Sequence, residues 1–139
     1  MPLIKITVGE HVFKARLEEE KAPKTCAAFL QRLPLSARLI QARWSGEAGW
    51  VPLGAADFGV GYENATSYPA PGQILLYPGG LSETEILFPY GSTMFASKVG
   101  QLAGNHFLTI VQGQERLEGA GKMILWDGAQ NIRFETTGE

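Results

Sequence analysis

Apolar and polar residues alternate through the first part of the chain in the way that half-buried strands do. Apolar residues recur at every second position from Ile4 to Val8 and again from Phe13 to Leu17. The Gly-Glu pair between the two runs suits a tight turn. The pattern therefore predicts a β-hairpin over residues 4–17.

A helical period follows this hairpin. Pro23 suits the first turn of a helix, where its missing N–H needs no partner. Four apolar residues then follow at helical spacing, namely Cys26, Phe29, Leu30 and Leu33. The pattern predicts a short amphipathic helix that packs this face on a sheet and ends at Pro34.

Later apolar runs predict more strands and one more helix. The strands are expected at residues 37–44, 48–53, 73–77 and 84–88, with a turn at 45–47 and Pro89 closing the last of them, and then at 106–111 and around 132–134. A weak helix is expected at residues 115–125, although Gly119 and Gly121 each cost a helix about 1 kcal/mol relative to alanine. Residues 54–72 show no period, and they are either a functional loop or ordered coil.

Composition supports a mainly β fold in one domain spanning residues 1–139. The 17 glycines and 8 prolines favour many short strands joined by tight turns. Hydrophobic residues make up 45% of the chain, charged residues make up 19% and the formal net charge is −2. These values argue against disorder and against a nucleic-acid-binding surface. No apolar run approaches the length that crosses a bilayer, so no membrane partner is expected.

The cysteine content and the start of the chain bear on the compartment. Cys26 is the only cysteine, so no internal disulfide can form, and its place on the apolar helix face suggests a buried, unreactive thiol. The first residues, MPLIKITVGE, lack the apolar run of a signal peptide. We therefore expect a cytoplasmic protein.

Three segments resemble the cyclophilin family and occur in the family's order. Residues 22–29 (APKTCAAF) are similar to the family's APKTVENF, Pro71-Gly72 with the following ILL resembles PGILSMAN, and residues 106–113 (HFLTIVQG) resemble HVVFGKVVEG. The resemblance implies a closed eight-stranded antiparallel β-barrel with two capping helices. The stretches ARWSGEAGW (42–50) and PGQILLYPGG (71–80) are more similar still to a bacterial family of small cyclophilin-like proteins of unassigned function.

The residues that carry prolyl isomerisation in cyclophilins are mostly missing. The family's catalytic arginine lies in FHRVIPGFMIQGGD, and only Arg38 and Arg43 stand near that place here, neither in a matching motif. The family's TNGSQFF corresponds at best to residues 83–87, where Glu85 and Ile86 change both charge and shape. The resemblance therefore implies the scaffold without ordinary prolyl isomerase activity.

The segment Arg43-Trp44-Ser45-Gly46-Glu47 is the first candidate ligand site. Arg43 can bind a ligand carboxylate through two parallel hydrogen bonds, with Trp44 or Trp50 as an apolar wall. The alternative is that Arg43 pairs with Glu47 across a hairpin while the tryptophans pack the barrel.

Further polar residues supply candidates for a pocket rim and for acid–base chemistry. Tyr62, Glu63 and Asn64, with Tyr77, can rim a pocket mouth, or they can serve as turn formers and lids on the core. Glu85 faces the same way as Glu83 in an extended strand, so the pair can raise one pKa for acid or base duty, or simply form a solvated edge.

His106 is the candidate general base, although a lone histidine at a strand start is more often structural. No metal or other cofactor is expected, because His11, His106 and Cys26 lack ligand spacing and no phosphate or dinucleotide loop is present.

Three functions remain open from the sequence. The leading prediction is a binding protein for, or an enzyme acting on, a small carboxylated or amide ligand, with a pocket around Arg43, Glu47, Tyr77, Glu85 and His106. The second is a residual prolyl isomerase. The third is a non-catalytic module that forms a homo-oligomer through an apolar barrel face containing Leu75, Tyr77, Leu87 and Phe88.

Overall fold

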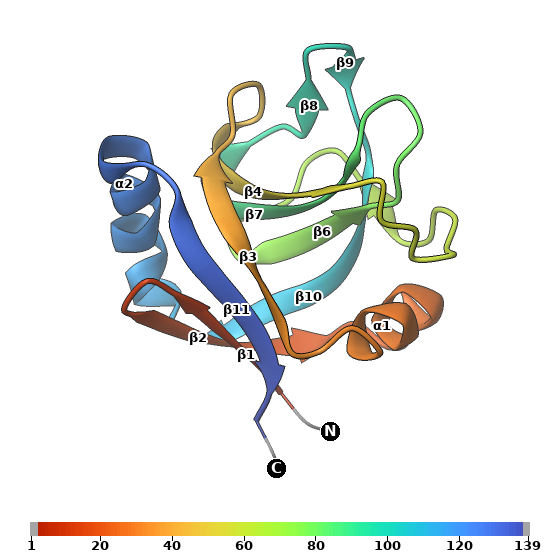
Figure 1. Cartoon of the computed structure of the whole chain (residues 1–139), viewed down its shortest axis with the longest axis horizontal. Helices are drawn as coiled ribbons and strands as arrows, with labels where there is room; N and C mark the ends of the chain where they lie inside the picture. Colours follow the sequence, from red (N-terminus) through yellow and green to blue (C-terminus); the bar gives the residue numbers. More distant parts are fainter. Residues whose placement is uncertain (1–2, 138–139) are drawn as a thin grey trace.

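The strands of the protein close into a barrel. A computed structural model describes residues 3–137. Its main sheet has the order β2-β1-β11-β3-β4-β7-β6-β10, and β10 pairs back onto β2, so eight antiparallel strands form a closed ring (Figure 1). The eight strands are β1 (Ile4–Val8), β2 (His11–Leu17), β3 (Leu35–Gln41), β4 (Gly46–Gly54), β6 (Gln73–Tyr77), β7 (Thr84–Thr93), β10 (Gly104–Gln112) and β11 (Gln130–Thr136). This confirms the fold class expected from the sequence.

Alternation along the strands decides which side chains fill the barrel. In the first hairpin, apolar residues of β1 and β2 are buried at every second position, as the sequence predicts. The rings of Phe13 and Phe88 meet edge to face inside, with centroids 5.7 Å apart. One continuous core therefore draws on strands from both ends of the chain.

Two helices cover the barrel on different sides (Figure 1). Helix α1 (Pro23–Leu30) buries Cys26 and Phe29, and the Phe29 ring packs edge to face on Phe107. A short 3-10 turn, η1 (Gln114–Arg116), leads into α2 (Leu117–Asp127), which packs on β3, β4 and β7. No helix within residues 3–137 is long and apolar enough to cross a membrane.

Helix α1 ends earlier than the sequence suggests. The N–H groups of Arg32 and Leu33 donate to carbonyls three residues back, so the chain turns tightly after Leu30. Leu33 still packs against the core, although it lies outside the helix. The apolar spacing predicts the buried face of this segment correctly, but spacing alone does not determine the residue at which the helical hydrogen bonds end.

The turn between β3 and β4 lies at residues 42–45 and not at 45–47. The Ala42 N–H donates to the Ala48 carbonyl, and Gly46 already belongs to β4. Gly46 has φ +101°, and a Cβ there would lie 2.8 Å from the Ser92 carbonyl oxygen, so only glycine fits. Arg43 and Trp44 are therefore on a loop tip and not in a strand.

Strand β7 does not stop at Pro89 but continues to Thr93. Pro89 lies opposite Ala48 next to a register shift in β4, and its carbonyl accepts the Gly72 N–H. The irregular pairing at this point accommodates a residue that has no N–H to donate. The sequence prediction of a strand ending at Pro89 is wrong.

A second apolar cluster lies on the outer face of the barrel. Its members on strands alternate with residues of the barrel interior. The buried members of the cluster are Ala48, Leu75, Tyr77, Leu87, Phe95 and Leu102. Phe95 and Leu102 flank a small hairpin of β8 (Ala96–Ser97) and β9 (Gly100–Gln101). The expectation of an open oligomer face through Leu75, Tyr77, Leu87 and Phe88 is therefore wrong, because all four are at most 1% exposed.

Residues 54–72 form an ordered loop that is tied to β10 and α1. A two-residue strand, β5 (Ala65–Thr66), pairs with β10. The buried Asn105 side chain accepts the Glu63 N–H and donates to the Gly61 carbonyl and to Thr25 Oγ1. The Glu63 carboxylate in turn accepts the Thr25 N–H in the first turn of α1. The loop is thus ordered coil held by these contacts, and a functional role for it stays a prediction.

Candidate functional site

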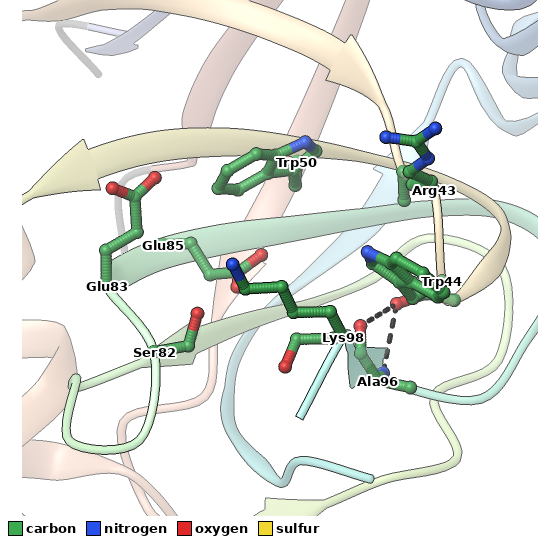
Figure 2. Close-up of a pocket in the computed structure, with 11 residues that line it drawn as sticks. Arg43, Trp44, Trp50, Ser82, Glu83, Glu85, Ala96 and Lys98 are labelled. Atoms are coloured by element: carbon green, nitrogen blue, oxygen red, sulfur yellow. Dashed lines mark hydrogen bonds between the residues drawn. The ribbon is translucent and has the colours of Figure 1, made fainter. Parts of the chain in front are cut away.

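A pocket of about 420 Å³ opens on the outer face, between the β3–β4 loop, the start of β7 and the small hairpin. We call it the Glu85 pocket (Figure 2). Its lining combines two tryptophans, two cations, two carboxyl groups and several small residues, namely Ala42, Arg43, Trp44, Ser45, Trp50, Ser82, Glu83, Glu85, Ala96, Ser97 and Lys98.

Strand register places the floor of the pocket. Glu85 lies between Pro52 of β4 and Tyr77 of β6, and it alternates with Ile86, which faces the barrel interior. Trp50 lies opposite Leu87, two residues further along β7. Glu85 and Trp50 therefore face outward next to each other, as Figure 2 shows.

Glu85 is buried without a partner. It is only 5% exposed, and no hydrogen bond or salt bridge within residues 3–137 involves its carboxyl group. Burial, and secondly the nearby Glu83 carboxylate, raise the pKa of Glu85 to about 8. At neutral pH the group is therefore mostly a neutral acid that can donate one hydrogen bond into the pocket.

Arg43 and Trp44 form the opposite side of the pocket. The Arg43 guanidinium lies 5.9 Å from the centroid of the Trp44 ring, and Trp44 is 54% exposed. The salt bridges within residues 3–137 join Arg16 to Glu18, Lys122 to Glu118 and Arg133 to Glu135. The Arg43 guanidinium is therefore available to bind a ligand. The alternative considered from the sequence, an ion pair between Arg43 and Glu47, is not observed.

Ser45 lines the pocket but its hydroxyl is already used. Its Oγ donates to the Ala96 carbonyl and accepts the Ala96 N–H, both at 3.0 Å. The Ser45 carbonyl also accepts the Met94 N–H. Ser45 therefore attaches the Trp44 corner to the small hairpin and brings Lys98 to the pocket, instead of presenting a free hydroxyl to a ligand.

Glu47 lies outside the Glu85 pocket. Its carboxylate accepts the Ser92 N–H at 2.8 Å and lines a separate groove between β4 and α2. The reason is that the turn lies earlier than predicted, at residues 42–45. Gly46 and Glu47 therefore belong to β4, whereas Arg43 is in the turn. The expectation that Glu47 shares a site with Arg43 is not met.

Tyr77 and Tyr62 do not line the Glu85 pocket either. Tyr77 is buried, and its hydroxyl accepts the N–H groups of Leu81 and Ser82, which holds the loop carrying Ser82 and Glu83 in place. Tyr62 is mostly exposed, and its partial burial together with the Tyr77 hydroxyl raises its pKa. Tyr77 thus supports the pocket from behind.

Asn64 is a turn former. It has φ +52°, its side chain donates to the His106 carbonyl at 2.9 Å, and its own carbonyl accepts the His106 N–H. Its amide therefore connects the long loop to β10 and does not rim a pocket. This is the alternative that the sequence left open.

His106 belongs to a different cluster. Its Nε2 lies 2.7 Å from Thr109 Oγ1, and the Thr109 hydroxyl donates to Glu18 Oε2, so Nε2 must carry the proton that Thr109 accepts. Burial lowers the pKa of His106, although the Glu18 carboxylate opposes this. Strands β6 and β7 lie between β10 and β4, the strand that carries Trp50. Three strand spacings of about 4.8 Å place β10 roughly 14 Å from β4. The expectation that His106 lies beside Arg43 is wrong.

Some lining residues carry no sequence signal. Lys98 and Ser97 reach the pocket only because a small hairpin folds over the outer face, and Ser82 lies in a turn. Trp50 and Glu83 can be predicted as site residues from the sequence, because they lie close to the candidates Trp44 and Glu85 along the chain. No group of three or more metal-binding side chains comes together among residues 3–137.

The comparisons with known proteins identify a family and a fold. Residues 4–136 match the family described as "Protein of unknown function (DUF3830)". The chain belongs to the DUF3830 family. No curated protein matches the sequence.

Two solved structures share the architecture of this DUF3830 protein. The structure of McbB in complex with tryptophan superposes with a TM-score of 0.71 at 17% identity, covering 98% of this chain and 45% of McbB. The solution structure of the hypothetical protein AF2241 from Archaeoglobus fulgidus gives a TM-score of 0.62 at 20% identity, covering 96% of this chain and 93% of that one. The chain thus spans less than half of McbB, and at these identities the likeness concerns the fold alone.

Proposed function

We propose that this DUF3830 protein binds a small carboxylated or amide ligand in the Glu85 pocket, on a cyclophilin-like barrel in the cytoplasm. The observation that carries the proposal is Glu85, a residue only 5% exposed whose carboxyl group has no partner among the described residues and opens onto a cavity that also holds Arg43. Buried polar groups in folded proteins nearly always have a partner, and one left open at a cavity wall is suited to a ligand.

The other lining residues fit the same ligand class. Arg43 can bind a carboxylate or an amide carbonyl, Glu85 can hydrogen-bond another polar group of the ligand, and Trp44 and Trp50 offer apolar surface to the rest of it. A volume of about 420 Å³ is in the usual range for a small-molecule pocket. McbB was solved in complex with tryptophan, a small carboxylated molecule, which supports the ligand class without identifying the residues that bind it.

Thermal shift and calorimetry with a series of aromatic carboxylates test the proposal. We expect the melting temperature to rise with ligand concentration. In calorimetry, Arg43→Ala should weaken the affinity at least tenfold, and Arg43→Lys should weaken it less, because lysine keeps the charge but cannot form the two parallel hydrogen bonds of arginine. Arg116→Ala, an exposed arginine on η1, is the matched control. Equal binding by Arg43→Ala and wild type would overturn the proposal.

Residual prolyl isomerase activity is the alternative that the cyclophilin resemblance suggests, and we propose that ordinary activity is absent. Arg38, one of two arginines near the family's catalytic position, points to β11, where it donates to Asn131 Oδ1 and to the Ala129 carbonyl. A proline-peptide isomerisation assay is expected to show no rate above background. A clear rate that Arg43→Ala removes would favour the isomerase instead.

Self-association is a further candidate because α2 leaves Leu125 and Trp126 uncovered. Trp126 is 80% exposed and lies with Leu125 at the groove that holds Glu47. Light scattering after size-exclusion chromatography should detect a homo-oligomer that Trp126→Glu dissociates. A monomer at high concentration would remove this candidate.

A further inference from the structure

The charges of the Glu85 pocket are separated along its length. Figure 2 shows Glu83 and Ser82 on one side and Arg43 with Trp44 on the other, with Trp50 and Glu85 between them. The strand register gives the same order of residues. Thr84, which follows Glu83 at the start of β7, lies opposite Gly54 near the end of β4, whereas Ala42, which precedes Arg43, is hydrogen-bonded to Ala48 near the beginning of β4. Six residue steps along β4, from Ala48 to Gly54, at about 3.3 Å each therefore separate the backbone near Ala42 from the start of β7 by roughly 20 Å.

Within the described residues, the carboxyl groups on the acidic side form no salt bridge, although Lys98 of the small hairpin extends toward Glu85 in the same pocket (Figure 2). Glu83 is exposed, Glu85 is buried, and the salt bridges within residues 3–137 include neither of them. The causes that raise the pKa of Glu85 are burial and Glu83, and neither Arg43 nor Lys98 counteracts them. Two neighbouring carboxyl groups that form no salt bridge with a cation of the described residues are a favourable place for a ligand ammonium group, because it can neutralise one and hydrogen-bond both.

The basic side offers the complementary group. Arg43 is free of carboxylates and lies over the Trp44 ring, so it presents a charged fork beside an aromatic face. Trp50 adds a second aromatic surface in the middle of the pocket. An elongated ligand with an apolar body and opposite charges at its two ends matches this arrangement.

Building on the proposed function, we propose that the Glu85 pocket selects zwitterionic amino carboxylates, with the ammonium group between Glu83 and Glu85, the carboxylate on Arg43 and an apolar body beside Trp50. An ammonium group at the acidic side favours the ionised form of Glu85. Binding near neutral pH therefore expels the proton that Glu85 holds in the free protein, and a ligand without an ammonium group does not cause this release.

Three isosteric probes separate the parts of the proposal. 4-(Aminomethyl)benzoate carries both charges, 4-methylbenzoate only the carboxylate and 4-methylbenzylamine only the ammonium group. Calorimetry at pH 7 in buffers of different ionisation enthalpy should show the zwitterion binding at least tenfold more tightly than either single-charge probe. It should also show release of up to about one proton per ligand for the zwitterion and none for 4-methylbenzoate.

Variants assign the two ends of the ligand. We expect Glu85→Gln to abolish the proton release and to reduce zwitterion affinity to that of 4-methylbenzoate, whose own binding changes little. Glu83→Gln should weaken only the amine-bearing probes, and Glu115→Gln, an exposed glutamate on η1, should change nothing. A melting curve for each variant confirms that it is folded.

The outcomes distinguish this inference from the proposed function. If 4-methylbenzoate binds as tightly as the zwitterion and depends on Arg43, the carboxylate pocket stands and the zwitterion inference is overturned. If 4-methylbenzylamine binds as tightly as the zwitterion, the inference is overturned at its carboxylate end. If none of the three probes binds up to millimolar concentration, both are overturned.

Discussion

At the scale of single residues, the contrast between Asn105 and Glu85 identifies where the protein is open to a ligand. Both side chains are buried and polar. Asn105 makes three hydrogen bonds within the fold, whereas Glu85 makes none to the described residues. A neutral acid costs less to bury than a carboxylate, so the fold tolerates Glu85 as long as it keeps its proton.

The proton on Glu85 links stability to pH. The folded protein holds this proton up to about pH 8, whereas the unfolded chain releases it near 4.5. The folded state thus binds more protons in this window, and the free energy of unfolding should fall as pH rises from about 5 to about 8, by on the order of 2–4 kcal/mol, and then level off.

Urea denaturation between about pH 5 and 9 measures this dependence. Glu85→Gln, which resembles the protonated form, should remove most of the decline and should be more stable than wild type at the alkaline end. Glu115→Gln should keep the wild-type profile. A wild-type stability that rises through this window would contradict the proposed state of Glu85.

At the scale of elements, the two glycines of α2 show why helix propensity predicts little here. A Cβ at Gly121 would lie 2.1 Å from Cδ1 of Tyr90, whose hydroxyl is fixed by Gln41. A Cβ at Gly119 would meet the His11 ring, with Cε1 at 3.3 Å and Nε2 at 3.8 Å. Gly121 therefore allows α2 to approach β7 closely, while Gly119 serves no comparable contact.

Alanine substitutions at these glycines should have opposite effects. Gly121→Ala should destabilise the protein by about 1–3 kcal/mol, since overpacking against Tyr90 outweighs a propensity gain of about 1 kcal/mol. Gly119→Ala should be neutral or stabilising by up to about 1 kcal/mol. Chemical denaturation of both variants checks this, and a stabilising Gly121→Ala would show that α2 does not pack as described.

The small hairpin depends on Ser45 for its position. Ser45→Ala loses two hydrogen bonds to Ala96 and leaves its part-buried N–H and carbonyl poorly satisfied, so we expect a loss of about 1–2 kcal/mol. Hydrogen exchange should rise at residues 96–101 and little elsewhere. Ser92→Ala, an exposed serine at the end of β7, serves as the control. Unchanged exchange in the hairpin would mean that other contacts position it.

Sequence patterns predict elements well where packing is local. The first hairpin, the start of α1 and the strand Gln73–Tyr77 follow directly from periodicity and proline placement. The β3–β4 turn and the extent of β7 do not, because a close contact at Gly46 and an irregular pairing at Pro89 decide them. Both depend on a neighbouring strand that is distant in sequence.

At the scale of the whole molecule, barrel closure explains which candidate residues meet. Arg43, Trp44 and Glu85 come together because β4 and β7 are neighbours and the small hairpin covers their outer face. His106 is excluded because two strands lie between, and Asn64 and Tyr77 are used to hold loops. The composition of a site is thus a property of strand order, which a single sequence reveals only through resemblance.

Closure also makes cooperative unfolding the expected behaviour. The pairing of β10 with β2 leaves no free edge in the ring, and one core contains residues of β1, α1, β7, α2 and β11. No strand can leave without opening the ring and exposing that core, so the barrel should unfold in one transition.

Urea unfolding followed by far-ultraviolet circular dichroism and by tryptophan fluorescence should give coincident curves. In Trp126→Phe the fluorescence comes only from Trp44 and Trp50 and reports on the Glu85 pocket. A fluorescence midpoint clearly below the circular dichroism midpoint in that variant would show that the pocket side opens before the barrel, contrary to this expectation.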